Sequence, residues 1–303
     1  MLKSTKELLL NAQAEGYALG HFNFGNLEGL QAIIHASEKT KMPVIAAVSE
    51  GAIAHAGLDY IMAMVELASG NSKTDFALHL DHGKSFEICE KAIKAGFSSV
   101  MIDASALSYE ENISLTRQVA ELAHAKNIAV EAELGRIPGT EEEIKSRDAY
   151  LTDPEQALEF VKETGIDALA ISIGTAHGAY KGEPKLDFDR LKEIKDKISI
   201  PLVLHGASQV PHNLVGEANN LGANLEGANG VPEEDIKKAI SMGICKINCD
   251  TDLNLAGIVA LRKILTEDPK EFKLYKILDV VYAEIEKMVE EKIKLYGVVT
   301  SEE

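Results

Sequence analysis

The sequence predicts a (β/α)8 TIM barrel with an extra C-terminal helix, and three observations support this fold. Short runs rich in β-branched and other apolar residues alternate with longer segments of 3.6-residue periodicity along the whole chain. Eight such strand-helix units follow one another. They occupy roughly 250 residues, the usual size of a closed barrel, whereas an open doubly wound sheet usually has fewer strands. We therefore expect residues 1–303 to form a single barrel domain.

The predicted strands are recognised by their apolar runs and by the polar or glycine residues that end them. In chain order the runs are ALGHFN ending at Asn23, PVIAAVS at Ser49, FALHLDH at His82, SVMID at Asp103, AVEAELG at Gly135, ALAISIG at Gly174, PLVLHGA at Ala207 and CKINCDT at Thr251. Connections 136–152 and 208–231 are longer than usual, and long connections are commonly functional or mobile. An amphipathic extension over about 270–296 is expected to cap the barrel or to pair subunits.

Composition limits the possible partners. The net charge of −17 is unsuited to nucleic acid or an anionic membrane, so an anionic ligand needs a locally positive pocket made by a metal or backbone amides. No apolar stretch is long enough to cross a bilayer, and we expect a cytoplasmic protein. Cys89, Cys245 and Cys249 form no CxxC pair, which fits a reducing compartment.

Polar residues gather where the predicted strands end, which is the face of such barrels that carries the active site. Packing alone does not explain so many of them, although Asn23 or Ser49 taken alone could simply cap the following helix. The set comprises Asn23, Ser49, Asp81, His82, Asp103, Glu131, Glu133, His177, His205, Asn248, Asp250 and Thr251.

Three of the nine histidines, His82, His177 and His205, are each followed by glycine near a strand end. Three neutral imidazoles without a fourth protein ligand are typical of a catalytic zinc with an open coordination position. The histidines are far apart in sequence, so only the barrel brings them together, and each could instead be a partly buried structural residue. Strand alternation also places His82 on the opposite face from Asp81, so His82 has to turn back into the barrel mouth.

Asp81 is the expected proton-transfer partner of this metal, with a ligand-orienting role as the alternative. Asp103, Glu131 and Glu133 could bind a second or alternate cation, or only support the histidines. Amides and hydroxyls of five residues are expected to hold a phosphate near the start of the eighth helix, which agrees with the usual phosphate position of such barrels. These residues are Gly178, Gly206, Ser208, Asn248 and Thr251.

Motifs through nearly the whole chain resemble those of class II fructose-bisphosphate aldolases and the related tagatose-bisphosphate aldolases. The most specific are HLDHG from His79 and LVLHGAS from Leu202, and KINCDTDL from Lys246 is another. The resemblance implies a zinc-dependent lyase of glycolysis and gluconeogenesis. Such an enzyme reversibly cleaves a ketose 1,6-bisphosphate, here expected to be fructose 1,6-bisphosphate, into dihydroxyacetone phosphate and glyceraldehyde 3-phosphate. We also expect a homo-oligomer, either a dimer or a tetramer.

The resemblance further assigns roles to individual residues. It implies that His82, His177 and His205 bind one Zn²⁺, and that Asp81 exchanges a proton with the C4 hydroxyl. Glu141 resembles the acid that transfers the C3 proton, with Glu142 as the alternative in the run TEEE, and Asp103 and Glu133 resemble alternate metal ligands. The resemblance also implies a site, often containing Na⁺ or K⁺, for the dihydroxyacetone-phosphate end of the substrate. Its residues would be Gly178, Lys181, Gly206, Ser208, Asn248, Asp250 and Thr251. We add Asn23 and Ser49 as candidate substrate-binding residues.

The sequence differs from the family pattern at Asn254, and it leaves open another substrate, another mechanism and a non-catalytic function. Asn254 stands where the resemblance implies an arginine for the distal phosphate, so tagatose bisphosphate or a related ketose phosphate is an alternative substrate. A Schiff-base lysine, Lys246, is a second possible mechanism, although this residue is expected to pair with a carboxylate inside the barrel. Asn254 and His21 also leave open a barrel that only binds phosphate and has lost catalysis.

Overall fold

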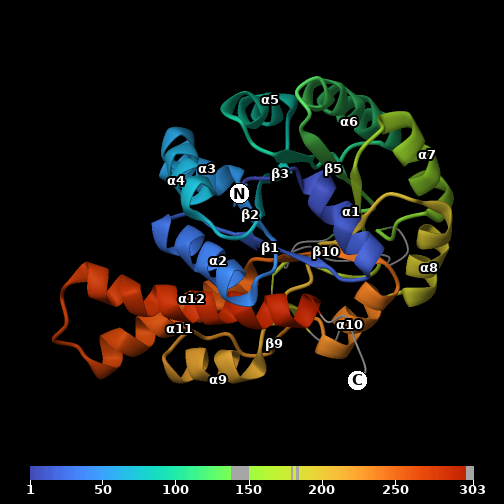
Figure 1. Cartoon of the computed structure of the whole chain (residues 1–303). Helices are drawn as coiled ribbons and strands as arrows, with labels where there is room; N and C mark the ends of the chain where they lie inside the picture. Colours follow the sequence, from blue (N-terminus) through green and yellow to red (C-terminus); the bar gives the residue numbers. More distant parts are fainter. Residues whose placement is uncertain (138–149, 179, 182–183, 298–303) are drawn as a thin grey trace.

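The computed structural model describes residues 1–137, 150–178, 180–181 and 184–297. Eight of the described strands form a closed parallel barrel in the order β1-β10-β8-β6-β5-β4-β3-β2, ringed by helices (Figure 1). The predicted fold is therefore confirmed. The barrel strands are β1 (Leu19–Asn23), β2 (Val44–Ser49), β3 (Phe76–Gly83), β4 (Ser99–Ile102), β5 (Ala129–Leu134), β6 (Ala168–Ile171), β8 (Leu202–Leu204) and β10 (Ile244–Cys249).

Helices cover the outside of the barrel, and several begin at polar residues that cap them. The Asn26 side chain accepts a hydrogen bond from a first-turn amide of α2, and Ser108 forms a capping box with Glu111 in α6. The surrounding helices are α2 (Leu27–Thr40), α3 (Glu50–Ala56), α4 (Leu58–Asn71), α5 (Phe86–Ala95), α6 (Tyr109–His124), α7 (Pro154–Thr164), α8 (Phe188–Lys197), α10 (Glu233–Ser241) and α11 (Thr251–Glu267).

The inside of the barrel changes character along its axis. At the amino end, helix α1 (Thr5–Glu15) packs Leu8, Leu9 and Ala12 onto apolar strand residues such as Ile45 and Val203. This apolar plug closes the bottom of the barrel. Towards the carboxyl end the interior is polar, and its buried side chains include His21, His79, Glu131, His205 and Lys246.

The buried charge of Lys246 is paired inside this polar layer. Its Nζ lies 3.0 Å from both carboxylate oxygens of Glu131, and it also donates to Asn248 Oδ1 at 2.8 Å. The expected pairing of Lys246 with an interior carboxylate is thus confirmed. Because Lys246 is fully buried and its amine is engaged by Glu131 and Asn248, it is not free to attack a substrate carbonyl, which argues against the lysine mechanism.

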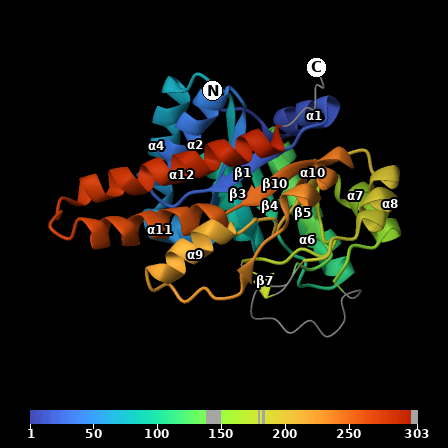
Figure 2. The same ribbon diagram turned by 90° about the horizontal axis from the view of Figure 1, so that it is seen from below.

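The C-terminal helix is present as α12 (Leu274–Tyr296) and runs beside α11 and α2 on the outside of the barrel (Figure 2). Val289 and Tyr296 are fully buried in this packing. The far end of the α11–α12 pair projects beyond the barrel and exposes Phe272, Leu274 and Tyr275.

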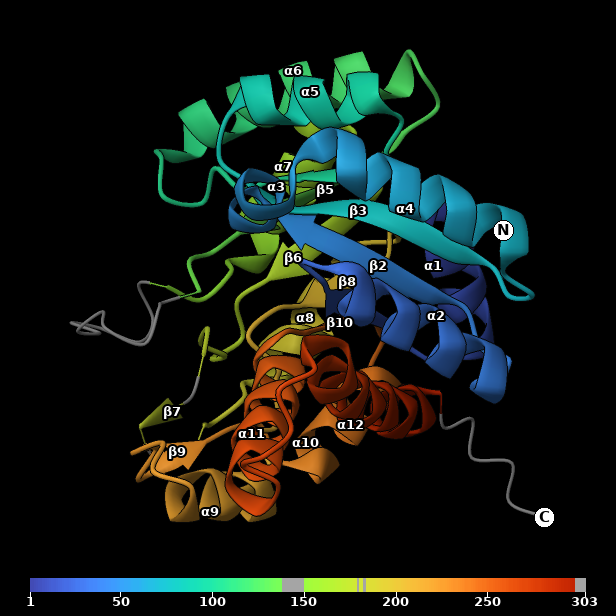
Figure 3. The same cartoon turned by 90° about the vertical axis from the view of Figure 1, so that its left-hand side faces the viewer.

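The connection after β8 contains structure that the sequence did not predict. Helix α9 (His212–Asn220) is followed by the short strand β9 (Ala228–Asn229), which pairs antiparallel with β7 (Tyr180–Lys181). Both short strands lie at the carboxyl end of the barrel strands (Figure 3). Within the described part of the chain, no helix is long and apolar enough to span a membrane.

Candidate metal centre and active site

A cavity of about 480 Å³ opens at the carboxyl end of the barrel, and most of the candidate residues line it. His205 lies beneath it and is fully buried. The structure therefore brings together side chains and glycines from every part of the sequence. The candidate residues in the cavity wall are Asn23, Ser49, Asp81, His82, His177, Gly178, Gly206, Ser208, Asn248, Asp250 and Thr251.

The backbone at His82 explains how this side chain enters the barrel mouth. His82 has φ of +47°, in the left-handed region, and the register between β3 and β4 shifts between Leu80 and Gly83. A non-glycine residue rarely adopts this conformation, and such backbone outliers cluster at functional sites. The turn places His82 Nε2 3.0 Å from His205 Nδ1, so the expected return of His82 into the mouth is confirmed.

The three histidines form one cluster with Glu133. One ligand atom from each of His82, His177, His205 and Glu133 lies within 4.8 Å of all the others. The His82 ring lies 4.8 Å from that of His177 and 4.7 Å from that of His205, measured between centroids. Two nitrogen ligands of tetrahedral Zn²⁺ lie about 3.3 Å apart when the Zn–N bonds are about 2.0–2.1 Å. The 3.0 Å separation of His82 Nε2 from His205 Nδ1 is close to this value.

Carboxylates fix which nitrogen of the His82 and His205 rings faces the cluster. Asp103 Oδ2 contacts His82 Nδ1 at 2.8 Å, and Glu131 Oε1 contacts His205 Nε2 at 2.8 Å. A carboxylate that accepts the outer N–H of an imidazole leaves the inner nitrogen free to bind a metal. Glu133 Oε2 is buried without a hydrogen-bond partner and lies 3.6 Å from His205 Nδ1. The donor set thus fits a zinc ion.

The electrostatics of the cluster also favour a cation. Burial acts to lower the pKa of His82, but the carboxylates of Asp81, Asp103 and Glu133 outweigh it and raise the pKa to about 9. Burial and the charge of Asp103 raise the pKa of Glu133 to about 8. Burial and the charge on His82 lower the pKa of His177 to about 4. The surrounding carboxylates therefore stabilise positive charge at this point, and a metal cation can supply it.

Gly206 allows the loops that carry His177 and His205 to pack closely. A Cβ atom on Gly206 would lie 2.4 Å from the carbonyl oxygen of Ala176, too close for any other residue. Tyr180 joins the same two loops, because its hydroxyl accepts from Ala176 N and donates to Gly206 O, both at 2.6 Å. Nothing in the sequence pattern marks Tyr180 as a site residue, although its position in AHGAYKG is close to the proposed ligand His177.

Asp81 is held beside the histidines by two asparagine amides. Asn23 Nδ2 donates to Asp81 Oδ2 at 2.8 Å, and Asn248 Nδ2 donates to Asp81 Oδ1 at 3.3 Å. The Asp81 side chain is 10% exposed and lies in the cavity wall. Both amides donate to the carboxylate and hold it in one orientation, so the arrangement places a possible proton acceptor at the cavity surface.

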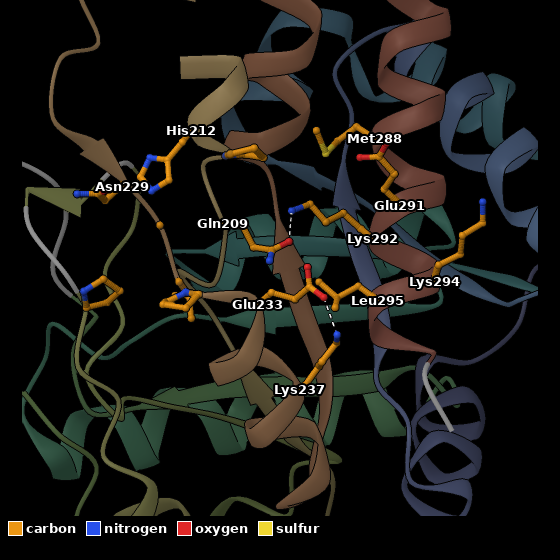
Figure 4. Close-up of a pocket in the computed structure, with 15 residues that line it drawn as sticks. Gln209, His212, Asn229, Glu233, Lys237, Met288, Glu291, Lys292, Lys294 and Leu295 are labelled. Carbon is orange, nitrogen blue, oxygen red and sulfur yellow. Dashed lines mark hydrogen bonds and ion pairs between the residues drawn. The ribbon is translucent and has the colours of Figure 1, made fainter. Parts of the chain in front are cut away.

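The segment that follows Ser208 is strained and is held by a buried ion pair. Val210 has φ of +46°, which is unfavourable for a β-branched residue. Asp252 accepts hydrogen bonds from Gln209 N at 3.0 Å and Val210 N at 2.7 Å, and Lys292 Nζ lies 2.5 Å from Asp252 Oδ2. Lys292 also donates to the Gln209 side chain, in the wall of a separate cavity of about 810 Å³ next to α12 (Figure 4). Through Lys292, helix α12 thereby holds Gln209 and Val210 in place.

Replacing Lys292 with methionine is expected to destabilise the protein by about 3–5 kcal/mol, because the buried Asp252 would lose its partner charge. Urea unfolding followed by circular dichroism measures this change. Lys294→Met removes an exposed lysine from the same helix and is the matched control, for which little change is expected. Equal stability of the two variants would contradict this role of Lys292.

Several other candidate residues have specific positions. Ser49 caps α3 by accepting from Ala52 N at 3.2 Å, which matches the capping alternative, and it also lies in the cavity wall. Asn254 donates to Asp250 Oδ1 at 2.9 Å at the cavity rim. Lys181 belongs to β7. Glu141 and its alternative Glu142 lie outside the described residues.

Known proteins resemble this chain over its full length. The family model described as "Fructose-bisphosphate aldolase class-II" matches residues 3–300. The chain is 47% identical over 302 residues to fructose-bisphosphate aldolase of Helicobacter pylori, covering 98% of each protein. It is 46% identical over 301 residues to the enzyme of that name from Thermus caldophilus, again covering 98% of each. The solved structure of the YdjI aldolase from Escherichia coli K12 superposes with a TM-score of 0.80 at 34% identity and full coverage of both chains. The chain therefore belongs to the class II fructose-bisphosphate aldolase family.

Proposed function

We propose that this protein catalyses the reversible, zinc-dependent cleavage of fructose 1,6-bisphosphate to dihydroxyacetone phosphate and glyceraldehyde 3-phosphate. The observation that carries the proposal is the position of Asp81, beside three converging histidines and in the wall of the same cavity as the anion-binding candidates. One substrate can therefore reach a metal, a proton acceptor and a phosphate site together.

His82, His177 and His205 would hold the zinc, with Asp103 and Glu131 orienting two of them. When bound, Zn²⁺ supplies Lewis-acid polarisation of the substrate ketone and stabilises negative charge on its oxygen. Glu133 lies close enough to the histidines to be an alternate ligand. Asp103, which contacts His82 Nδ1, is the other candidate for that role. The chain thus provides three imidazoles and leaves room for substrate oxygens to bind.

Asp81 takes the proton of the C4 hydroxyl in the cleavage direction. As this proton leaves, the C3–C4 bond breaks, the C4 oxygen becomes the aldehyde carbonyl, and the bonding electron pair passes to the enediolate of dihydroxyacetone phosphate. Glu141, or Glu142, then returns a proton to C3. Asn23 and Asn248 donate hydrogen bonds to Asp81. In this proposal they therefore orient the proton acceptor as well as bind the substrate.

The phosphate of the dihydroxyacetone end would bind between the β6, β8 and β10 ends of the barrel. Gly178 and Gly206 have positive φ, and Thr251 is the first residue of the 17-residue helix α11, whose free amides attract anions. Ser208 adds a hydroxyl in the same wall. Lys181, Asp250 and a Na⁺ or K⁺ ion complete the proposed site. This location supplies local positive potential in a protein of net charge −17.

Tagatose 1,6-bisphosphate is the second candidate substrate, and Asn254 is the observation that favours it. Its amide is engaged by Asp250 at the cavity rim and adds no positive charge there. A charged contact to the distal phosphate typically contributes a few kcal/mol, enough to change substrate preference substantially.

A coupled assay tests the substrate assignment by comparing initial cleavage rates of fructose, tagatose and sedoheptulose bisphosphates, each with and without a chelator. We expect fructose 1,6-bisphosphate to have the highest kcat/KM and chelation to abolish every rate. Equal rates on fructose and tagatose bisphosphates would contradict the assignment. Binding without cleavage in the presence of zinc would instead identify a barrel that has lost catalysis.

We also propose that the protein acts in the cytoplasm as a homo-oligomer, a dimer or a tetramer. The projecting α11–α12 pair supports oligomerisation, since it exposes large apolar side chains, including Ile258, Leu265, Phe272, Leu274 and Tyr275. Replacing Phe272 and Tyr275 with serine is expected to reduce the molar mass measured by light scattering during gel filtration. An unchanged oligomer, or a wild-type monomer, would contradict the use of this surface.

A further inference from the structure

Two neighbouring strands present the same arrangement of side chains to Asp81. On β1, His21 lies two residues before Asn23, and on β10, Lys246 lies two residues before Asn248. The strands pair in parallel with His21 opposite Asn248. Side chains two residues apart on a strand share a face, so each strand places a donor below an asparagine in the polar interior.

Each donor fixes the orientation of the asparagine above it. Lys246 Nζ donates to Asn248 Oδ1 at 2.8 Å, and an ammonium group has no acceptor, so the Asn248 NH₂ group must face Asp81. His21 Nε2 lies 3.0 Å from Asn23 Oδ1 but 3.6 Å from Asp81 Oδ1, beyond hydrogen-bond distance, and Asn23 Nδ2 donates to Asp81 Oδ2. His21 Nδ1 is buried without a hydrogen-bond partner, which is the arrangement expected when Nε2 carries the proton.

We propose that His21 is a positioning residue for Asp81 and acts through the Asn23 amide. By donating to Asn23 Oδ1, His21 keeps the NH₂ group on Asp81 Oδ2 and so fixes the plane of the carboxylate that accepts the C4 proton. Without this donor, the Asn23 carbonyl would be buried and unpaired. Rotation of the amide would then place its oxygen against the carboxylate, and the two would repel.

This role rests on the proposed cleavage reaction and concerns only one part of it. Cleavage needs Asp81 because a C4 hydroxyl loses its proton. Exchange of the C3 hydrogen of dihydroxyacetone phosphate with solvent needs the metal, the phosphate site and the acid at C3, but no C4 hydroxyl is present. A residue that positions Asp81 therefore affects cleavage and spares exchange, whereas a residue that supports the fold or the metal affects both.

Three substitutions at His21 separate these possibilities. His21→Gln can place an amide N–H near the position of Nε2, so it retains a donor to Asn23. His21→Asn ends near the position of Nδ1 and cannot reach Asn23, although it is also a neutral amide. His21→Phe keeps the ring and loses the donor. Zinc content and melting temperature are measured for all three, so that each rate refers to folded, metal-loaded enzyme.

We expect His21→Asn and His21→Phe to lower kcat for cleavage by about tenfold to a hundredfold, the effect of a misplaced reacting group. Deuterium exchange into dihydroxyacetone phosphate, followed by proton NMR, should stay within about twofold of wild type, and His21→Gln should recover most of the cleavage rate. In an Asn23→Ala background, His21→Asn should have little further effect, because both residues act through one contact.

Three results would overturn the proposal: unchanged cleavage in both donor-free variants, equal losses of cleavage and exchange, or no recovery in His21→Gln. Failure of the wild-type protein to cleave any ketose bisphosphate is a different result, which overturns the proposed function and the role of His21 with it.

Discussion

Replacing Asp81 with alanine is expected to lower kcat for cleavage by about a thousandfold, with little change in KM or in bound zinc. A positioned general acid or base typically contributes about 10²–10⁴ to the rate, and Asp81 is the carboxylate that faces the cavity next to the three histidines. Its hydrogen bonds are to the amides of Asn23 and Asn248, so its removal leaves the His82 and His205 partners Asp103 and Glu131 in place.

The matched control is Asp59→Ala, which removes an exposed carboxylate from the first turn of α4 and should leave kcat unchanged. Steady-state kinetics and metal analysis of both variants measure the effect. Full activity in Asp81→Ala would exclude Asp81 as the proton acceptor. Loss of zinc in parallel with activity would show instead that Asp81 supports the metal.

Replacing His177 with alanine is expected to remove most of the bound zinc and to lower activity by at least about a thousandfold. Removing a residue that only hydrogen-bonds to a metal ligand typically lowers metal affinity by about 10–100-fold. Removing the ligand itself should lower the affinity further. Lewis-acid stabilisation is worth several kcal/mol, and about 4 kcal/mol corresponds to a thousandfold in rate. His177 lies in the loop after β6, outside the barrel strands, so the fold should tolerate the change.

Elemental analysis and kcat measured together test this expectation. His55→Ala, which removes an exposed histidine from α3, should keep both the metal and the activity. Zinc bound at one ion per chain in His177→Ala, with wild-type activity, would contradict the assignment of His177 as a ligand.

The barrel itself could be predicted because its physical signals are local. Parallel strands buried on both faces give short apolar runs, and the polar residues that end them mark the mouth of the barrel. All eight predicted strands are present. Helix α9 was missed because its sequence HNLVGEANN contains Gly and several Asn, which are poor helix formers. Packing overrides these propensities, since Val215 and Ala218 are buried beneath the helix against α11.

The sequence predicted which residues form the site, but not the hydrogen bonds between them. Strand parity places Asn23, Asn248 and Lys246 in the interior, but it does not give the hydrogen bonds between them. The contacts of Asn23 and Asn248 to Asp81 therefore emerge only in the folded structure. His82 shows the same limit, because a single residue of positive φ reverses the face that alternation assigns to it. Asp252 and Lys292 were missed because they act from behind the loop, through a helix at the far end of the sequence.

The most direct test of the account is the release of dihydroxyacetone phosphate from fructose 1,6-bisphosphate by the purified protein before chelation, after chelation and after zinc is restored. The histidine cluster predicts cleavage that chelation abolishes and that one equivalent of Zn²⁺ per chain restores. Cleavage that persists after the metal is removed, together with a covalent adduct on Lys246 trapped by borohydride, would contradict it.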